Sequence, residues 1–305
     1  GSNPTMLNVS ISNNTTTGFG GGIMCKNNSN PILTNVFING NTALEDGGGI
    51  HCYEDSNPNL SQVTITGNSA SLGGGIACDY FSNPIIKDCV ISGNSASVDG
   101  GGIYCHYRSN PILTNVEISN NSALEWGGGF LARNQSNPIL KNVTISDNLA
   151  GYGGAGITLY YSNPNFVNSI LWGNSPESIN IDFGENNLVI NYSSIEGGWE
   201  GEGNININPL FANPEDGDYT LQGESPCIDE GIAFFVMMEA EELIDENDNG
   251  IWDWGEDFTD SNGNGLWDSE VIINLDDSEY YGSAPDMGAY EFEESSTVMG
   301  DVNDD

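Results

Sequence analysis

The sequence contains very few cationic residues, and this scarcity excludes several classes of protein. Its 305 residues include 5 Lys and Arg against 44 Asp and Glu, and the formal net charge is −39. A protein that binds DNA or an anionic membrane surface needs clustered Lys and Arg to displace the counterions of its partner. We therefore expect no nucleic-acid partner, and we expect cations to be the natural ligands.

Long apolar runs and a leader segment are absent as well. No stretch of about 18 apolar residues occurs, so no membrane-spanning helix is expected. The first residues, Gly1-Ser2-Asn3-Pro4, carry no basic and apolar leader, so we expect any secretion signal to lie outside this sequence. Apolar residues make up only 37% of the chain, but a strict repeat argues against disorder.

The repeat has a period of 26 or 27 residues. Apolar residues stand two, five and seven places after the proline of nearly every copy, and the last two positions alternate with polar residues, which is typical of a strand with one buried face. A second strand follows a glycine run in six copies, where glycine permits positive φ and close approach between coils. The repeat is marked by Ser-Asn-Pro, with prolines at Pro4, Pro31, Pro58, Pro84, Pro111, Pro138 and Pro164.

Two further positions of the repeat predict ladders of identical side chains. The tenth residue after the proline is always Asn, and stacked Asn amides can hydrogen-bond one above another while they satisfy the turn backbone. Cys25, Cys52, Cys78 and Cys105 share a second position, which favours a buried ladder of reduced thiols. An oxidised pair between adjacent coils stays open as the alternative. No Cys-x2-Cys spacing occurs, which argues against zinc bound by these thiols.

Coils of this length, with short strands and no helical periodicity, fit an all-β, right-handed parallel β-helix whose coils lie about 4.8 Å apart. The repeats resemble those of right-handed parallel β-helix surface proteins of bacteria, including the Gly-Gly-[Ala/Gly]-Ile repeats of polymorphic outer-membrane proteins and pectate-lyase-like solenoids. This resemblance covers residues 1–176 and indicates a fold more strongly than a function. We expect regular β-helix coils over residues 1–176.

The rest of the chain is strongly acidic and carries a second resemblance. Asn204 to Phe211, Ser225 to Asp229 and Ala284 to Tyr290 resemble the closing segment of secreted bacterial β-helix proteins of the choice-of-anchor group. Gly300 to Asp305 resembles the opening of a dockerin calcium loop. We predict closing coils over 177–235, acidic tandem calcium-binding loops over 236–275, a final strand segment over 276–294, and a linker with the start of a truncated dockerin-like tail over 295–305.

The strongest metal-binding motif is a pair of acidic loops that resemble the calcium loops of dockerins and thrombospondin type 3 repeats. Residues 245–256 match the pattern Asp-x-[Asp/Asn]-x-[Asp/Asn]-Gly-x5-Glu, and a second copy begins fifteen residues later, with its glutamate one place early. Hard oxygen ligands at this spacing suit Ca²⁺, which we expect to be structural. The predicted ligands are Asp245, Asn247, Asn249, Ile251, Asp253 and Glu256, then Asp260, Asn262, Asn264, Leu266, Asp268 and Glu270.

Aromatic and polar residues gather between the cysteine row and the next Ser-Asn-Pro, and we call this group the aromatic edge. Aromatic rings beside polar groups can stack on sugars, so the edge is a candidate carbohydrate site. It also suggests a polysaccharide lyase with Arg108 or Arg133 as base and Asp79 as helper, although such a lyase needs a positive groove. Stacked aromatics also stabilise solenoid faces without a ligand. The edge comprises Tyr53, Asp79, Tyr80, His106, Tyr107, Arg108, Arg133 and Tyr160.

These observations favour a non-enzymatic, extracellular structural or adhesive rod of a bacterial surface or fibre protein, stabilised by calcium. The alternative is a carbohydrate-binding or carbohydrate-cleaving β-helix. Besides calcium, the expected partner is a second copy of the chain, joined end to end, or a cell-surface polysaccharide. The sequence begins at a coil boundary without a capping segment, so either it is cut there or another molecule covers the open strand edge. In the second case the edge could accept residues 291–298 of a neighbour and propagate a fibre.

Overall fold

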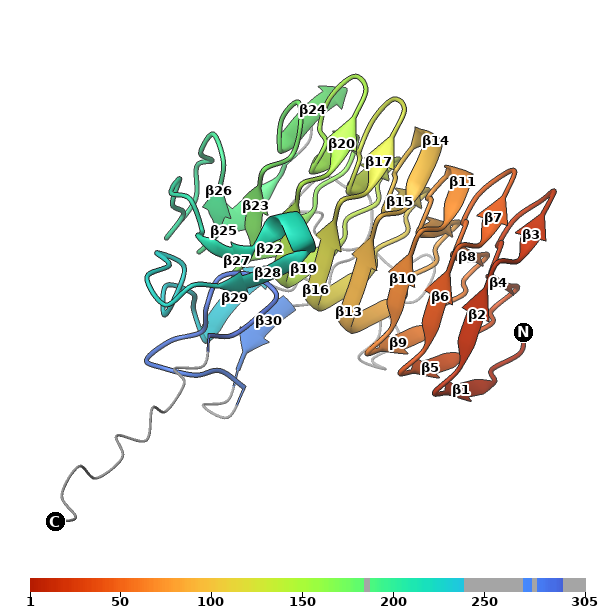
Figure 1. Cartoon of the computed structure of the whole chain (residues 1–305), viewed down its shortest axis with the longest axis horizontal. Coiled ribbons are helices and arrows are strands. Elements are labelled where there is room, and N and C mark those ends of the chain that lie inside the picture. The colour runs from red at the N-terminus through yellow and green to blue at the C-terminus, as the bar shows by residue number, and fades with distance from the viewer. Residues whose placement is uncertain (184–186, 239–270, 276–278, 293–305) are drawn as a thin grey trace, which may run out of the picture.

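The chain winds into a parallel β-helix in the computed structural model, which describes residues 1–183, 187–238, 271–275 and 279–292 (Figure 1). Each regular coil contributes strands to three parallel sheets that run along the solenoid. The expected all-β parallel β-helix is confirmed.

The first sheet is the largest and carries the alternating residues after each Ser-Asn-Pro. Residues at the same repeat position pair directly, so Leu33 lies beside Leu60 and Ile86 beside Leu113. Its 13 strands are β1 (Thr5–Leu7), β2 (Ser10–Ser12), β5 (Ile32–Thr34), β6 (Phe37–Asn39), β9 (Asn59–Ser61), β10 (Thr64–Thr66), β13 (Ile85–Ser92), β16 (Ile112–Ser119), β19 (Ile139–Ser146), β22 (Asn165–Val167), β23 (Ile170–Trp172), β25 (Val189–Asn191) and β26 (Ser194–Ile195).

The other two sheets lie on either side of the glycine runs. The second sheet comprises β3 (Thr15–Thr16), β7 (Thr42–Ala43), β11 (Ser69–Leu72), β14 (Ser95–Asp99), β17 (Ser122–Ala123) and β20 (Leu149–Ala150). The third sheet comprises β4 (Ile23–Lys26), β8 (Ile50–Tyr53), β12 (Ile76–Asp79), β15 (Ile103–His106), β18 (Phe130–Arg133), β21 (Ile157–Tyr160) and β24 (Ile179–Phe183). A Cβ on Gly75, in one glycine run, would lie 2.6 Å from the Gly102 carbonyl oxygen, so the coils stack this closely only with glycine there.

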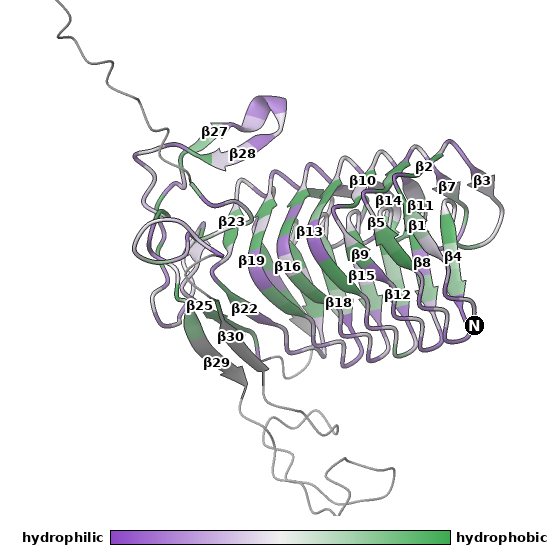
Figure 2. Cartoon of the chain, turned by 90° about the horizontal axis from the view of Figure 1, so that it is seen from below, coloured by the Kyte–Doolittle hydropathy of each residue, from purple (hydrophilic) through white to green (hydrophobic). Residues whose placement is uncertain are grey.

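The core is a stack of aliphatic side chains, and hydrophilic residues occupy much of the turns between strands (Figure 2). The predicted Asn ladder is confirmed, and its side chains from Asn41 to Asn174 are buried. In its middle, the backbone N–H and the side-chain amide of Asn68 both donate to Asn94 Oδ1 at 3.0 Å, and Asn94 Nδ2 donates to the Ile65 carbonyl at 2.9 Å. The amides therefore bind each coil to its neighbours, through the next amide of the ladder and through a strand carbonyl of the preceding coil.

All six cysteines are buried, free thiols. Four of them form the expected ladder, in which Cys25, Cys52, Cys78 and Cys105 occupy paired positions of β4, β8, β12 and β15. Hydrogen bonding to Cys105 and burial raise the pKa of the Cys78 thiol. The ladder therefore packs as part of the core in its reduced form.

After the regular coils, a closing segment folds back over the first sheet. It contains the antiparallel strands β27 (Phe211–Asn213) and β28 (Asp218–Leu221), joined by the 3₁₀ turn η1 (Pro214–Asp216), and the antiparallel pair β29 (Phe234–Met238) and β30 (Val271–Asn274). Tyr219 and Met287 form a small second core with Ile170. The Ala289 N–H donates to Thr144 Oγ1 at 2.9 Å, and Tyr290 donates to Glu117.

Candidate functional site

The aromatic edge lies at the corner that follows the third sheet, where the chain makes a left-handed turn. Tyr80 and Phe81 have φ of 50° and 62°, and Tyr107 and Arg108 have φ of 51° and 59°. The same turn in the first coil uses Asn27 and Asn28. Asn tolerates this conformation, whereas bulky side chains rarely adopt it. The aromatic residues therefore occupy positions that backbone energetics alone would give to Asn.

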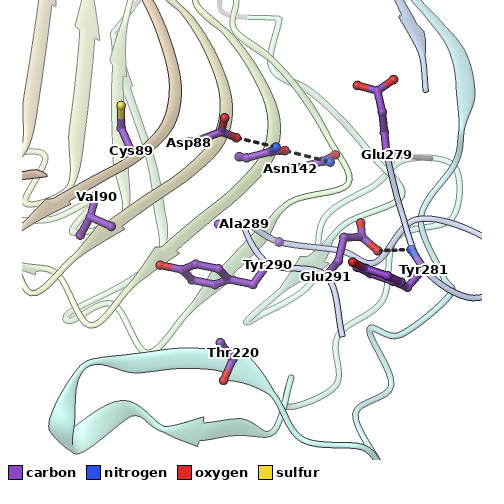
Figure 3. A pocket seen from close by; sticks show the side chains of 12 residues that line it. Asp88, Cys89, Val90, Asn142, Thr220, Glu279, Tyr281, Ala289, Tyr290 and Glu291 are labelled. Carbon is purple, nitrogen blue, oxygen red and sulfur yellow. Dashed lines mark hydrogen bonds between the residues drawn. The ribbon is translucent and has the colours of Figure 1, made fainter. Parts of the chain in front are cut away.

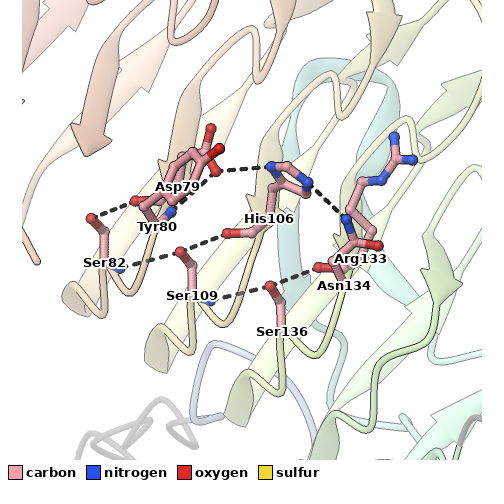
Figure 4. Close-up of polar contacts among 8 residues, drawn as sticks. All are labelled: Asp79, Tyr80, Ser82, His106, Ser109, Arg133, Asn134 and Ser136. Carbon is pink, nitrogen blue, oxygen red and sulfur yellow. Dashed lines mark hydrogen bonds and ion pairs between the residues drawn. The ribbon is translucent and has the colours of Figure 1, made fainter. Parts of the chain in front are cut away.

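Two side-chain ladders hold this corner in place, and they explain the Ser-Asn-Pro motif. Figure 4 shows the serine ladder. Ser82 Oγ donates to the Asp79 carbonyl at 2.8 Å and accepts the Ser56 N–H at 3.2 Å, and Ser109 repeats this pattern one coil later. The Asn side chain binds in the opposite direction, since Asn83 Oδ1 accepts the N–H of Asn110 at 2.6 Å. The corner is thus rigid before any ligand binds.

The edge presents a continuous row of rings. The centroids of Tyr53 and Tyr80 are 5.2 Å apart, those of Tyr80 and Tyr107 are 5.0 Å apart, and those of Phe81 and Tyr107 are 5.8 Å apart. These separations are typical of favourable aromatic pairs. Among the eight residues predicted for the edge, Tyr80 and Tyr107 are exposed, at 39% and 44%, and the other six are half-buried.

The polar groups of the edge are largely engaged with one another. His106 Nδ1 lies 2.8 Å from Asp79 Oδ1, and Asn134 Nδ2 lies 2.9 Å from His106 Nε2 (Figure 4). Because the Asn134 amide donates to Nε2, the ring proton resides on Nδ1 and is donated to Asp79. Arg108 Nε donates to Gln135 Oε1 at 2.8 Å.

Arg133, the other predicted base, packs inward. Its guanidinium lies 5.4 Å from the centroid of the Tyr160 ring, as in a cation–π contact, and its charge opposes the rise that burial causes in the pKa of the neighbouring Tyr104. The structure thus brings all eight predicted residues onto one edge, but it does not direct Arg133 toward solvent as a free cation.

The surface has two hollows near the residues described so far. One, of about 260 Å³, lies on the edge and is lined by Tyr107, Arg108, Asn134, Gln135 and Tyr161, of which Tyr161 is 57% exposed. It is smaller than the roughly 300–1,000 Å³ of typical pockets for drug-sized ligands. The hollow is therefore a shallow recess in which rings and polar groups adjoin.

A larger hollow, of about 400 Å³, lies between the first sheet and the closing segment (Figure 3). Its walls include Asp88 and Asn142 from the sheet and Tyr290 and Glu291 from the closing segment. Burial and the neighbouring charge of Asp286 raise the pKa of Glu291 to about 7. Sequence reasoning did not find this hollow, because its walls come from distant parts of the chain.

Sequence reasoning also omitted Asp46 and His51 from the site. One ligand atom from each of Asp46, His51 and Asp79 lies within 4.8 Å of the other two. Burial lowers the pKa of His51 to about 4, and burial together with the charge of Asp79 raises the pKa of Asp46 to about 6. A signal was present in the sequence, since Asp46 precedes a glycine run where other coils carry Phe19 or Leu72.

The predicted calcium ligands, Asp245 to Glu256 and Asp260 to Glu270, lie outside the described residues. Calcium binding there remains a prediction from the sequence. The proposed donor segment, residues 291–298, lies mostly outside the described residues as well.

Comparison with known protein families gives one match. A family model described as a right-handed beta helix region matches residues 2–99 and 95–208, which together span more than half of the chain. No curated protein and no solved structure matches the chain. No helix in the described part of the chain combines the length and apolarity that a membrane crossing requires.

Proposed function

The chain belongs to the right-handed β-helix family, and from this premise we propose that it is a non-enzymatic, extracellular structural rod of a bacterial surface or fibre protein. The observation that carries the proposal is the unbroken stacking of its coils. Paired core residues, the Asn ladder and the two Ser-Asn-Pro ladders each connect one coil to the next, so the regular coils are joined by contacts of their own. Such a rod would keep the parts of the protein at its two ends at a fixed distance from each other.

The chemistry of the edge supports a role without catalysis. A lyase base must be free to accept a proton from the substrate, and the substrate of a polyuronate lyase needs a positive groove. His106 is held between Asp79 and Asn134, Arg108 is bonded to Gln135, and Arg133 packs on Tyr160. The chain has 5 Lys and Arg and 44 acidic residues, and this excess of negative charge opposes the binding of an acidic polysaccharide.

A second candidate function is carbohydrate binding without cleavage, and one observation favours it. Tyr80, Phe81 and Tyr107 occupy left-handed turn positions that cost a non-glycine, non-Asn residue of order 1 kcal/mol each. Strained positions of this kind concentrate at functional sites. Exposed rings on a rigid corner, beside the recess at Tyr161, form a platform on which neutral sugars can stack.

One double variant separates the two functions. Replacing Tyr80 and Tyr107 by Asn removes the rings and installs a residue that suits the turn, so the fold is retained. The control is Leu124→Asn, which removes an apolar side chain that is 66% exposed and belongs to a different corner. Binding to a panel of cell-surface polysaccharides is measured by affinity electrophoresis, with circular dichroism as the check on folding.

The rod proposal predicts equally weak retardation for the wild type and both variants. Retardation of the wild type that disappears only in the Tyr80→Asn, Tyr107→Asn variant would replace it by the carbohydrate-binding function. Calcium at residues 245–270 and end-to-end association with a second copy belong to the same proposal. Electron microscopy in millimolar calcium and after chelation tests the association, and discrete monomers in both conditions would remove it.

A further inference from the structure

A group of ligand-type side chains beside the aromatic edge is not used by the proposed function. Asp46 ends the segment before the glycine run of the second coil, His51 lies in β8 of the same coil, and Asp79 ends β12 of the third coil. One imidazole nitrogen and one oxygen of each carboxylate lie within 4.8 Å of one another. The Phe19 ring, with its centroid 5.2 Å from that of His51, covers the imidazole.

His51 has no bonding partner of its own. Its side chain is 1% exposed, and neither Nδ1 nor Nε2 has a hydrogen-bond partner among the described residues. A buried polar group without a partner costs about 1–3 kcal/mol. Packing does not require an imidazole here, since the paired residues in the adjacent coils are Met24 and Ala77. One ring nitrogen of a neutral imidazole carries a lone pair, so the orphaned His51 side chain points to a ligand that accepts it.

An internal comparison identifies the missing partner as a cation. Two coils further on, Asp99 and Tyr104 occupy the positions of Asp46 and His51 around the next such glycine run, and Arg133 occupies the position of Asp79. There burial raises the pKa of Asp99 and of the buried Tyr104, and the neighbouring Arg133 charge opposes both rises, so the protein supplies its own cation. In the group of Asp46, His51 and Asp79, the residue at the arginine position is the second carboxylate, Asp79. Two acidic side chains therefore lie beside a buried imidazole.

We propose that Asp46, His51 and Asp79 form a binding site for a divalent transition-metal ion, with Zn²⁺ as the best-fitting ion. Imidazole nitrogen with carboxylate oxygen is a ligand set that zinc accepts, whereas Ca²⁺ and Mg²⁺ prefer oxygen alone. Zinc ligands at about 2.1 Å in tetrahedral geometry lie about 3.4 Å apart, so side-chain rotations close the site from its present separation. A fourth position remains for water or another ligand.

One of the three residues, Asp79, has the kind of outer-shell partner that known metal ligands have. Asn134 donates to His106, and His106 donates to Asp79 Oδ1, which fixes the orientation of that carboxylate and leaves its second oxygen available. Such outer-shell partners orient metal ligands and strengthen binding. Because Asp46 and His51 belong to one coil and Asp79 to the next, the ion would join two coils directly beneath the aromatic edge.

The test uses the full chain, stripped with chelator and returned to buffer with excess calcium chloride, which occupies acidic loops. Zinc chloride alone is titrated by calorimetry, and Co²⁺ is added separately to read tetrahedral coordination by visible absorption. The variants are His51→Leu, with a side chain the same row already uses at Leu131, and Asp46→Asn, at a partly exposed position. The matched control is Asp99→Asn, which alters the equivalent acid in the arginine-balanced cluster.

The proposal predicts that the wild type and Asp99→Asn bind one zinc ion that both other variants bind more weakly, by more than the 10–100-fold typical of losing an outer-shell partner. The Co²⁺ absorption should disappear in the same two variants. If His51→Leu fails to fold by circular dichroism, Asp46→Asn decides. Equal zinc affinity in the wild type and Asp46→Asn, or no zinc binding by the wild type, would overturn the proposal. Either result leaves the rod function standing.

Discussion

Replacing Asn94 by alanine tests how much of the stability of the solenoid resides in its Asn ladder. Asn94 is 1% exposed, and its side chain makes four hydrogen bonds. It accepts from the backbone and side-chain amides of Asn68, and it donates to the Ile65 carbonyl and to Asn121 Oδ1. Alanine keeps the bonds that the backbone of residue 94 makes with Asn121 and Ser122, and it removes the four side-chain bonds.

The magnitude follows from the groups that lose their partners. The Asn68 backbone N–H, one Asn68 amide hydrogen and the Ile65 carbonyl each lose a bond in the interior. At about 1 kcal/mol for each, the lower end for buried unsatisfied groups, the free energy of unfolding falls by about 3 kcal/mol. The matched control is Asn14→Ala, since Asn14 is exposed and its side chain donates one bond, to Asn41 Oδ1. Its loss should cost less than about 1 kcal/mol.

The measurement is urea unfolding of the wild type and both variants, followed by far-ultraviolet circular dichroism. The midpoint should fall clearly for Asn94→Ala and hardly at all for Asn14→Ala, with similar slopes for all three proteins. If the two variants lost the same free energy, within about 0.5 kcal/mol, the ladder would be a consequence of stacking rather than a source of stability.

Three further predictions concern the thiols, the closing segment and the acidic loops. A thiol reagent at pH 8 should modify none of the buried cysteines in the native state and all six after unfolding, because burial shields the thiols and, with hydrogen bonding, raises the pKa of Cys52 and Cys78. Rapid native labelling, followed by mass spectrometry, would contradict this. Burial raises the pKa of Glu291 from 4.5 to about 7, so the native state binds more protons than the unfolded state between these values and stability falls as pH rises through that window. Urea titrations at pH 5 and pH 8 should show a smaller loss for Glu291→Gln than for the wild type, and equal losses would refute the assignment. Chelation of calcium should lower the thermal unfolding midpoint of the wild type more than that of Asp245→Ala, and calorimetric traces unaffected by chelation would rule out a stabilising calcium site.

The regular coils could be predicted from the sequence because their contacts repeat. The spacing of Ser-Asn-Pro specifies which residues lie one above another, and the paired strands follow that register, as in Leu33 beside Leu60. The Asn and Cys ladders follow by the same logic, since identical side chains at one repeat position must meet. Periodicity thus determined the fold, the core and the residues of the aromatic edge.

Contacts that break the period could not be predicted. Glu117 stands at a polar strand position that reads as solvent-exposed, but Tyr290 of the closing segment covers and bonds it. No repeat relates residues so far apart. The group of Asp46, His51 and Asp79 was missed for a related reason, since it joins residues from three different repeat positions and depends on how the glycine run turns. The periodicity of the sequence predicts contacts between residues at the same repeat position, but it does not predict contacts between residues at different positions.

The ladders also bear on how the length of this protein can change in evolution. In the Asn ladder and the two Ser-Asn-Pro ladders, residues of an internal coil meet the same residue type one coil away, so both ends of such a coil present equivalent surfaces. Removal of residues 32–58 would bring the first coil against the third with the Asn, Ser and proline-corner contacts continued, and duplication of that unit would extend the chain equally well. Among the described residues, the hydrogen bonds of the closing segment reach back to Glu117, so coils near the first strand can be gained or lost without breaking them. Unequal recombination between repeats can therefore change the reach of the molecule in steps of one coil while every intermediate still folds.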